Sequence, residues 1–319
     1  MDVFAGALKN EDELIQCASG GAATAISNEV LRRKGVVFGV AYTKDFRSAE
    51  YISVESKTDL DRIKGSKYVE TEKDLKKVAD TLLQGKMTLF IGLGCDVAAI
   101  KAYCNRKNIK MDNLYTIDIL CHGPVSREVH RKFIEDLEKK YKSRVVSFNE
   151  RYKKEGWVPS YLKVVFENGK VYEELFEFTD LGYVFSKFPL SRCTNCHFKG
   201  SNHQGDICIG DCFGISKNME GYNKNGVSCI IIQTEKGKQI LELLDDSFEL
   251  NGITEEIIVD YNPMYYKSRK KNVDYEQFNK MLSVYGLHNA LKRNSDYKKW
   301  KKGVRTIKVK RKLLSILKK

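Results

Sequence analysis

Proline is scarce in this chain, and long apolar runs are missing from it. The sequence has four prolines in 319 residues and no low-complexity tract, which argues against long disordered linkers. It contains no run of about 18 apolar residues, so it predicts no membrane-spanning helix. The first residues, Met1–Gly6, lack the basic and apolar regions of a secretory signal peptide. We therefore expect a cytoplasmic protein whose thiols stay reduced.

Acidic residues are nearly missing from the C-terminal segment, residues 291–319. This segment holds thirteen Lys and Arg residues against one acid, Asp296, which is a net charge of +12. The whole chain carries +13, so residues 1–290 carry about +1. A binding domain for nucleic acid carries a basic face of its own, so we expect no nucleic-acid partner.

The basic segment has a second interpretation as a helix. Its cations would then alternate with apolar side chains, namely Trp300, Ile307, Leu313, Leu314, Ile316 and Leu317. A basic amphipathic helix suits an anionic membrane surface and would hold the protein peripherally at the inner membrane face. The alternative is a solvated tail or one that docks on a partner protein.

Apolar strands and amphipathic helices alternate in the first half of the chain. Strands are expected over Val36–Tyr42, Tyr51–Ser56, Met87–Ile91 and Leu114–Leu120, and helices over 25–34, 60–63, 73–83, 97–104 and 128–141. This alternation is typical of an α/β fold with a mixed, mostly parallel sheet core. We assign it to residues 1–142.

The pattern becomes β-rich from residue 143 onward. Strands over 145–149, 161–166 and 170–176 alternate apolar and polar residues, and Asn168-Gly169 predicts a hairpin turn. A further strand over Ser228–Gln233 and helices over 237–244 and 275–285 follow. We expect a single core over 1–290. Its second part, 143–290, holds a β-rich insertion and a cysteine-containing ligand-binding segment, and the basic tail 291–319 follows.

Nine cysteines in a reducing compartment suggest ligands rather than disulfides. Cys193 and Cys196 form a C-x-x-C pair, a spacing that lets two thiolates reach one metal or cluster. Cys95 and Cys121 each end an apolar strand, where ligands collect in an open α/β sheet. The plain alternative for these two is a buried small apolar side chain.

Two sets of four cysteines are therefore open. The contiguous set, Cys193, Cys196, Cys208 and Cys212, resembles a zinc knuckle and would make the chain a non-enzymatic zinc-stabilised adaptor. On an extended strand, however, Cys208 and Cys212 would lie roughly 13 Å apart, too far for one ion or one cluster. Geometry therefore favours the dispersed set, Cys95, Cys121, Cys193 and Cys196.

Glycines mark two candidate loops and one candidate strand for a cofactor. Ser19-Gly20-Gly21 precedes a helix, whose exposed N–H groups can cradle a phosphate, although such a pair is more often an ordinary turn. Gly65-Ser66-Lys67-Tyr68 adds a cation and an aromatic ring, and by itself is also an ordinary loop. The run from Gly205 to Ile215 predicts a strand that passes close to a ligand.

Taken in order, these motifs resemble the beta subunit family of deazaflavin-coenzyme-reducing hydrogenases and dehydrogenases of methanogens, with its bacterial relatives. The resemblance covers about residues 10–235. The matched motifs are Ala18-Ser-Gly-Gly21, Arg62-Ile-Lys-Gly-Ser-Lys-Tyr-Val69, Gly92-Leu-Gly-Cys95, Asp118-Ile-Leu-Cys-His-Gly123, Cys193-Thr-Asn-Cys-His-Phe-Lys199 and Asp206-Ile-Cys-Ile-Gly-Asp-Cys-Phe-Gly214.

The resemblance implies an oxidoreductase that binds FAD and a 4Fe–4S cluster. It implies cluster ligation by Cys95, Cys121, Cys193 and Cys196. It places the flavin against Ser19, Gly20, Gly21, Thr24, Gly65, Ser66, Lys67, Tyr68, Asp206, Ile207 and Asp211. Electrons would pass between these cofactors and a deazaflavin coenzyme, NAD(P)H or a metabolite such as a sugar intermediate. An oligomeric assembly is compatible with this interpretation.

Three departures from the family pattern accompany the resemblance. The chain begins at the family core without a ferredoxin-like domain, so we expect one cluster and a separate, ferredoxin-like electron partner. Leu93-Gly94-Cys95-Asp96 stands where relatives have Thr-Pro-Cys-Gln. Cys208 and Cys212 replace a small residue and an aromatic one, and we expect them to be packing residues.

Three polar residues beside these motifs have both a functional and a structural interpretation. His122 is the candidate proton donor, and a hydrogen-bonded structural histidine is the alternative. For His197 we favour that structural role. Asp211 contacts cofactor hydroxyls or simply ends a strand.

Overall fold

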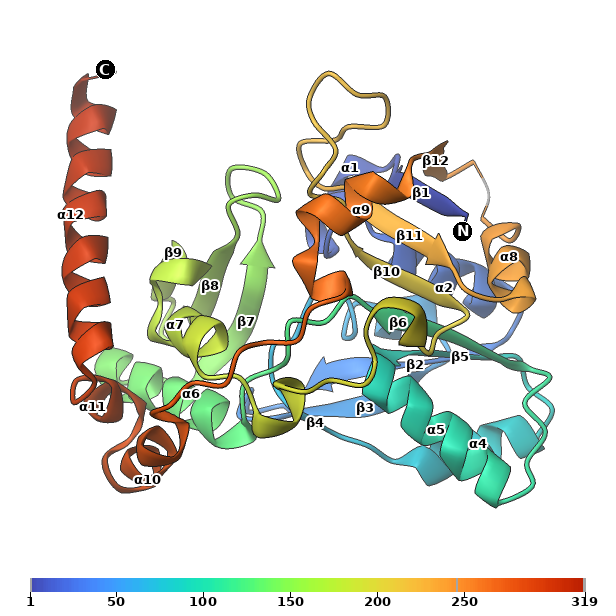
Figure 1. The fold of residues 1–319 in the computed structure, drawn as a ribbon, viewed down its shortest axis with the longest axis horizontal. Helices are drawn as coiled ribbons and strands as arrows, with labels where there is room; N and C mark the ends of the chain where they lie inside the picture. The colour runs from blue at the N-terminus through green and yellow to red at the C-terminus, as the bar shows by residue number, and fades with distance from the viewer. Residues whose placement is uncertain (1, 245, 318–319) are drawn as a thin grey trace.

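The computed structural model describes residues 2–244 and 246–317 as two packed lobes and a long C-terminal helix (Figure 1). The larger lobe contains a nine-stranded sheet in the order β12-β1-β11-β10-β6-β5-β2-β3-β4. These strands are β1 (Val3–Leu8), β2 (Val36–Tyr42), β3 (Ala49–Val54), β4 (Thr71–Glu72), β5 (Thr88–Leu93), β6 (Leu114–Ile119), β10 (Ile207–Asp211), β11 (Ser228–Ile232) and β12 (Phe248–Gly252).

The four central strands, β10, β6, β5 and β2, run parallel to one another. β1 and β11 are antiparallel neighbours, and so are β11 and β10, which leaves β1 pointing the same way as the central four. Five strands therefore end at one edge of the sheet. Ligand sites of open α/β sheets lie at such an edge.

Helices cover both faces of this sheet because the central strands are apolar on both sides. One face is covered by α1 (Glu11–Gln16), α2 (Ala22–Arg32), α3 (Lys57–Leu60) and α8 (Glu235–Leu241). The other is covered by α4 (Leu75–Leu83) and α5 (Gly94–Arg106) at one end and by α9 (Glu255–Tyr261) at the other. The large buried side chains Phe38, Phe90 and Ile117 lie within these layers.

The smaller lobe is built on an antiparallel sheet of β7 (Val145–Tyr152), β8 (Tyr161–Phe166) and β9 (Val171–Leu175). Asn168-Gly169 forms the predicted hairpin turn, with Gly169 at φ +78°. Helices α6 (Arg127–Tyr141), α7 (Asp180–Lys187), α10 (Tyr275–Tyr285) and α11 (Leu287–Leu291) pack against it in one apolar cluster.

Helix α6 illustrates how the local sequence specifies these elements. The Ser126 hydroxyl accepts a hydrogen bond from the Val129 N–H at 3.2 Å and caps the first turn. Val129, Phe133 and Leu137 recur at helical spacing and are buried against the small sheet. The helix ends at Lys142, whose φ of +51° cannot continue it.

The predicted α/β class with a mixed sheet is confirmed, but the expected internal division is not the one observed. Strands β10, β11 and β12 lie beyond residue 142 and nevertheless join the large sheet beside β1. The chain therefore returns to its first lobe after the β-rich insertion. Strand β1, which we did not predict, is central to this return, because it pairs with both β11 and β12.

The segment expected as a tail from residue 291 forms helix α12 (Ser295–Leu317), and its first turns are packed. Tyr297 and Val304 are buried, and Trp300 joins the apolar cluster of the smaller lobe. Residues 318–319 lie outside the described part of the chain. Within the described residues, no helix is both long and apolar enough to cross a membrane.

Candidate cofactor site

A cavity of about 590 Å³ opens at the edge where the five strands end. Segments that follow β1, β3, β5 and β6 contribute to its wall. Strands β2 and β10 contribute residues of their own, and Ser228 at the start of β11 completes the wall. Its volume lies within the range of small-molecule and cofactor sites. The sheet topology thus brings together residues as far apart in sequence as Ala18 and Arg269.

The wall contains most of the residues that we predicted for a cofactor. They are Ser19, Gly21, Thr24, Gly65, Ser66, Lys67, Tyr68 and Asp211, together with the candidate proton donor His122 and the four cysteines Cys95, Cys121, Cys193 and Cys196. Two loops and two cysteine pairs from separate parts of the sequence therefore meet around one space.

The N-terminus of α2 points its first turn into this cavity. Gly21 is the N-cap, with φ at +79°, and it has no side chain to occupy the first N–H groups. Ala22, Ala23 and Thr24 of this turn line the wall. The Ala22 N–H lies 3.5 Å from the Ser228 hydroxyl, and Gly21 gives the turn no side-chain cap. The N–H groups of this turn and the positive end of an eleven-residue helix form an anion site, which suits a phosphate.

Gly20 lies behind the wall rather than in it. A Cβ at this position would lie 2.1 Å from the Gly6 carbonyl oxygen and 2.5 Å from the Ser228 nitrogen. The Gly20 N–H donates to the Ser228 hydroxyl at 3.0 Å. Its role is therefore to let the loop pack closely against β1 and β11, and the expected direct contact is corrected.

Asp206 and Ile207 are also corrected as cavity residues. The Asp206 carboxylate accepts hydrogen bonds from the Thr116 N–H at 2.8 Å and from the Thr234 hydroxyl at 2.7 Å. Asp206 therefore joins β6 to the turn before α8. Ile207 is fully buried in the core under α2. The motif reaches the cavity two residues later, at Ile209, Gly210 and Asp211.

Asp211 is held by a partner that the sequence analysis missed. Arg151, at the end of β7, lies 2.6 Å from the Asp211 carboxylate, and this side chain is nearly buried. The Ser19 hydroxyl donates to the same oxygen, Asp211 Oδ1, at 2.5 Å. The charge of Asp211 and the nearby Tyr68 raise the pKa of Arg151 despite its burial. The pair closes the cavity from the side of the smaller lobe.

Lys153 is a second missed residue from the same strand end. Its ammonium group donates to the carbonyl oxygens of Leu14 and Ser19, both at 2.7 Å. These bonds hold Ser19 at φ +49°, a left-handed conformation that is uncommon for serine. Burial lowers the pKa of Lys153 to about 8. No local pattern could identify Arg151 or Lys153, because their partners are 60 to 139 residues away.

The second loop, 65–68, is anchored from beneath by Glu150. This fully buried carboxylate accepts the Tyr68 N–H at 2.8 Å and the Tyr42 hydroxyl at 2.5 Å. Lys67 donates to the carbonyl oxygens of Lys64, Arg62 and Gly65 and thereby closes the loop on itself. Burial raises the pKa of Glu150 to about 7 and lowers that of Lys67 to about 7.

Glu150→Gln tests this anchor through its pH dependence. The folded-state pKa of Glu150 lies above its ordinary value of 4.5, so folding favours the protonated form. The stability that protonated Glu150 contributes is complete below its ordinary pKa of 4.5 and is lost as the pH rises through about 7. We expect urea unfolding at several pH values to show wild type losing stability relative to Glu150→Gln as pH rises. The surface variant Glu55→Gln is the control, and parallel pH profiles for all three proteins would contradict the assignment.

Cys95 and Cys121 follow β5 and β6, whereas the glycine loop follows β1, which is separated from β6 by β11 and β10. We call these two parts of the cavity the cysteine end and the glycine end. After burial, neighbouring thiols also raise the pKa of three of the four cysteines. Cys121 and Cys193 act on Cys95, Cys193 and Cys196 act on Cys121, and Cys196 acts on Cys193. Burial and these neighbours hold the pKa of Cys95 at about 12 and that of Cys121 at about 11. Cys95 is exposed, so this end of the cavity reaches the protein surface.

Backbone contacts hold this cysteine group in place. The Gly123 N–H donates to Cys121 Sγ at 3.1 Å, and a Cβ on Gly123 would lie 3.2 Å from Cys193 Sγ. The Cys196 N–H donates to the Ser268 hydroxyl at 3.0 Å. Lys199 donates to the carbonyl oxygens of Cys121 and Met264, both at 2.6 Å.

The sequence of the segment that carries this site matches a known family. Residues 85–256, which are more than half of the chain, match the family model for the C terminus of the coenzyme F420 hydrogenase/dehydrogenase beta subunit. The chain belongs to this family. The matched range contains all four cysteines, Gly123, Arg151 and Asp211. The predicted family resemblance is confirmed, and with it membership of an oxidoreductase family.

The fold of this family member is also similar to a solved structure. The structure is described as a xenon derivatization of the F420-reducing [NiFe] hydrogenase complex from Methanosarcina barkeri. One chain of it superimposes with a TM-score of 0.59 at 15% identity, covering 91% of the present chain and 96% of the other. This likeness concerns the fold. A search of curated proteins gave no match.

The contiguous cysteine set of the adaptor hypothesis does not assemble in this family member. Cys208 and Cys212 are buried in the apolar cluster beneath α9, whereas Cys193 and Cys196 line the cavity. Among the described residues, one group of potential ligands is close enough for a single ion, and it consists of Asp118, His203 and Cys208. The expected packing role of Cys208 and Cys212 therefore agrees with their positions.

Asp118, His203 and Cys208 form a buried hydrogen-bonded network behind the cysteine group. His203 Nδ1 lies 3.0 Å from Asp118 Oδ2 and 3.4 Å from Cys208 Sγ, and its ring stacks on Tyr265. Asp118 also accepts the Gln204 N–H at 2.8 Å. These contacts join the end of β6 to the loop that follows Cys196 and Lys199, and thereby support the cavity wall.

His122 lies in the cavity against an aromatic wall. Its ring centroid is 5.9 Å from that of Phe185, which in turn is 4.6 Å from Tyr68. Burial lowers the pKa of His122 to about 4, with the nearby Arg269 and Lys199 acting in the same direction. The imidazole is therefore neutral at pH 7. A neutral imidazole can donate one hydrogen bond and accept another, so a hydrogen-bonding role for His122 agrees with this environment.

Proposed function

We propose that this protein is an iron–sulfur flavoprotein oxidoreductase with one 4Fe–4S cluster and one FAD in the same cavity. The observation that carries this proposal is the wall of the cavity. It joins four cysteine thiols at one end to a helix N-terminus and a glycine loop at the other, within about 590 Å³. Membership of an F420 hydrogenase/dehydrogenase family supports the redox assignment.

The cysteine end fits a cluster better than a single ion. In five pairs of these thiols, one thiol raises the pKa of the other. In the described part of the chain, however, no three of the four thiols are close enough to share one ion. A cubane takes one thiolate at each of four corners, so its ligands stand farther apart than those of zinc. The backbone of Gly123 passes close to Cys193, and a Cβ on Gly123 would lie in tight contact with Cys193 Sγ. We assign Cys95, Cys121, Cys193 and Cys196 as the four ligands.

The glycine end fits the phosphates of a dinucleotide. The first turn of α2 presents N–H groups, and Lys64, Lys67 and Arg127 also line the cavity. Thr24 and Ser66 add hydroxyl groups. Tyr68 and Phe185 provide an aromatic wall between this end and His122, which suits a planar ring system. Asp211, fixed by Arg151, offers an acceptor for a ribityl or ribose hydroxyl.

The residues of the chain bind, orient and shield, while the cofactors supply the chemistry. Bound flavin exchanges a hydride, and a bound cluster exchanges single electrons. The sheet edge keeps both binding regions in one cavity, and Phe185 and Tyr68 give its wall an apolar, aromatic part. His122 offers a neutral hydrogen-bonding group there. The substrate class that we assign is a hydride carrier or small metabolite, namely the deazaflavin coenzyme, NAD(P)H or a sugar intermediate.

An absorption spectrum of anaerobically purified protein tests the proposal directly. Iron, labile sulfide, flavin and zinc are quantified on the same sample. We expect flavin bands above a broad cluster absorption, with about four irons and one flavin per chain. A colourless protein loaded with zinc would overturn the proposal and support the adaptor hypothesis instead.

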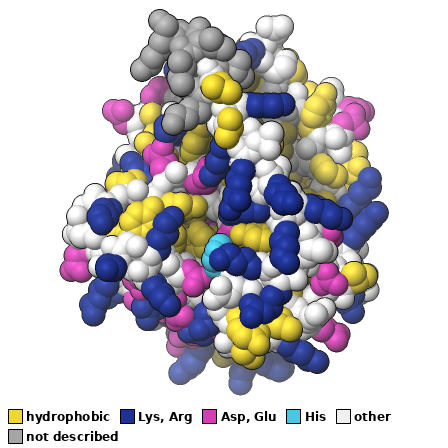
Figure 2. Space-filling model, turned by 90° about the vertical axis from the view of Figure 1, so that its left-hand side faces the viewer, with side chains coloured by type: hydrophobic (Ala, Val, Ile, Leu, Met, Phe, Trp, Pro, Cys, Tyr) yellow, Lys and Arg dark blue, Asp and Glu magenta, His cyan; other side chains and the backbone are white. Residues whose placement is uncertain are grey.

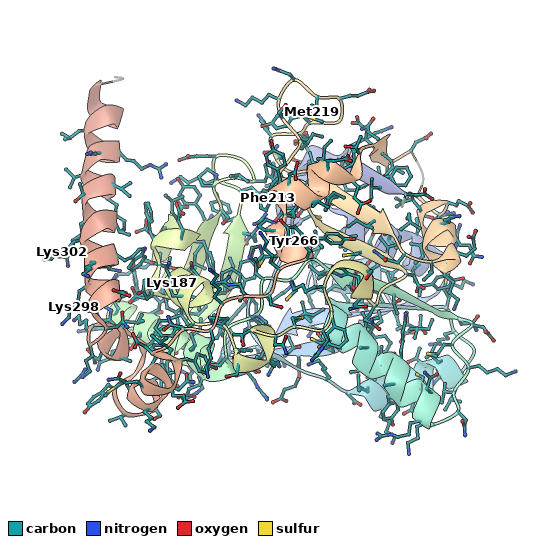
Figure 3. All side chains as sticks on the ribbon, in the orientation of Figure 1. Lys187, Phe213, Met219, Tyr266, Lys298 and Lys302 are labelled. Carbon is teal, nitrogen blue, oxygen red and sulfur yellow. The ribbon has the colours of Figure 1, made fainter. Side chains whose placement is uncertain are left out.

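A separate electron carrier is the partner that we propose for the cysteine end. The segment 267–271 contacts Cys196 through Ser268, and four of its five residues are Lys or Arg. Lys270 and Lys271 are exposed, and Tyr266 beside them is 42% exposed (Figure 3). A basic surface with an exposed ring over a redox site suits an acidic, ferredoxin-like protein.

Lys270→Glu/Lys271→Glu tests this docking surface. We expect the rate of flavin reduction by a reduced, acidic ferredoxin to fall at least about tenfold at low ionic strength, because electrostatic steering is lost. Iron and flavin contents should be unchanged. Lys107→Glu/Lys110→Glu makes the same charge change at the far end of α5 and should have little effect. Equal rates for the two variants would exclude this surface.

A further inference from the structure

For the side chains of α12 that the structure describes, the contacts with the smaller lobe lie along one side of the helix. Tyr297, Trp300 and Val304 pack against the lobe at the first turns. Farther along, Lys301 lies 2.9 Å from Asp180, and Arg311 lies 3.5 Å from Glu155. Lys308 pairs with Glu174 in the same row. These positions recur every three or four residues, so they define a single attached face of the helix.

The opposite face of α12 combines cations with apolar side chains. At 100° per residue, Lys298, Lys302, Val309 and Leu313 lie on the side away from the attached face. Val309 is 59% exposed and Leu313 is 56% exposed. Among the described residues, no acidic group forms an ion pair with Lys298 or Lys302, and Figure 3 shows both on the outer side of the helix.

The acids near α12 leave this outer face positive. Asp180, Glu174 and Glu155 lie on the lobe and are paired with the attached face. Figure 2 looks onto this end of the molecule and shows Lys and Arg side chains along it, with apolar patches between them. In Figure 1 the helix is the outermost element at this end. A flat surface can therefore contact the outer face along the length of the helix.

We propose that the outer face of α12 binds the surface of an anionic phospholipid bilayer. Phosphate headgroups attract Lys298 and Lys302, and the exposed side chains of Val309 and Leu313 enter the interface between headgroups and acyl chains. Both features are needed for this fit. Nucleic acid would match the cations and leave the apolar side chains unused. The inference does not depend on the cofactors, since α12 lies outside the cavity wall.

Co-sedimentation of the full chain with lipid vesicles tests this inference. One set of vesicles is pure phosphatidylcholine, and the other contains ~30% phosphatidylglycerol, which supplies the negative surface potential. We expect binding to the anionic vesicles alone, and a decrease in affinity as salt is raised. Equal binding to both vesicle types, or binding to neither, would overturn the proposal.

Three variants separate the two contributions to binding. We expect Lys298→Glu/Lys302→Glu to reduce the affinity for anionic vesicles at least about tenfold. We expect Val309→Ser/Leu313→Ser to reduce it as well, because the apolar contact is lost. Lys107→Glu/Lys110→Glu, at the opposite end of the molecule, is the control with equal net charge and should bind like wild type.

Two other outcomes would also count against a membrane surface. One is full binding by the serine variant, because the apolar side chains would then have no part in it. The other is competition by a short DNA duplex that abolishes vesicle binding at equal phosphate concentration, because a general polyanion site would then explain the data. Flavin and iron contents, measured on every variant, report separately on the cofactor site.

Discussion

We expect replacement of Cys121 with serine to remove iron and labile sulfide from the purified protein. Cys121 interacts with all three other thiols, since its pKa responds to Cys193 and Cys196 and it raises that of Cys95. A serine hydroxyl is a harder and less acidic ligand than a thiol, so it does not hold iron at a cluster corner. We expect iron to fall from about four per chain to near zero.

The control for this result is Cys104→Ser. Cys104 is a fully buried residue of α5 in the apolar cluster that includes α4, outside the cavity wall. The Cys104→Ser protein should therefore keep its iron content. Flavin content distinguishes ligand loss from misfolding, because the glycine loop lies at the other end of the cavity. Cys121→Ser protein that keeps its flavin and loses its iron supports the assignment. Full iron content in this variant would remove Cys121 from the ligand set.

Gly20→Ala is expected to have the largest effect at the glycine end. The added Cβ would lie 2.1 Å from the Gly6 carbonyl oxygen and 2.5 Å from the Ser228 nitrogen, and both are backbone atoms of the sheet. The loop must move away from β1 and β11, which we expect to cost about 3 kcal/mol of stability. The N–H groups at the start of α2 move with it. We expect flavin affinity to fall about tenfold, which corresponds to ~1.4 kcal/mol of binding free energy.

Gly252→Ala is the matched control for Gly20→Ala. A Cβ on Gly252 would have no atom within 4 Å, so the same chemical change meets open space there. Thermal unfolding and flavin affinity are measured for both variants. Gly20→Ala protein with wild-type flavin affinity would show that the position of this loop does not control flavin binding.

Local patterns in the sequence were sufficient for many elements of secondary structure. The hairpin at Asn168-Gly169 and the helix over 275–285 agree with β8, β9 and α10, because turn chemistry and apolar spacing act within a few residues. The same holds for the cysteine pair Cys193–Cys196, whose spacing alone keeps two thiols together. Strand β2 was predicted with its observed bounds.

The family, the α/β class and the candidate cofactor residues all follow from the order of the amino acids. Which of these candidates meet depends on the folded chain. Asp206 and Asp211 belong to one short motif, but Asp206 binds Thr116 and Thr234 while Asp211 faces the cavity. Side chains along a strand alternate between its two faces, so Asp206 and Asp211 have different surroundings. The sequence does not state which face holds the ligand.

Long-range pairing decided the rest. Arg151 reaches Asp211 across the two lobes, and Lys153 holds Ser19 from a strand that begins more than 120 residues later. The return of β10–β12 to the first sheet depends on β1, which is paired on both sides. Such contacts depend on the order of the strands in the sheet. That order is determined by the burial of many strands together. A local pattern cannot encode these contacts, because each strand alone has the same apolar character wherever it pairs.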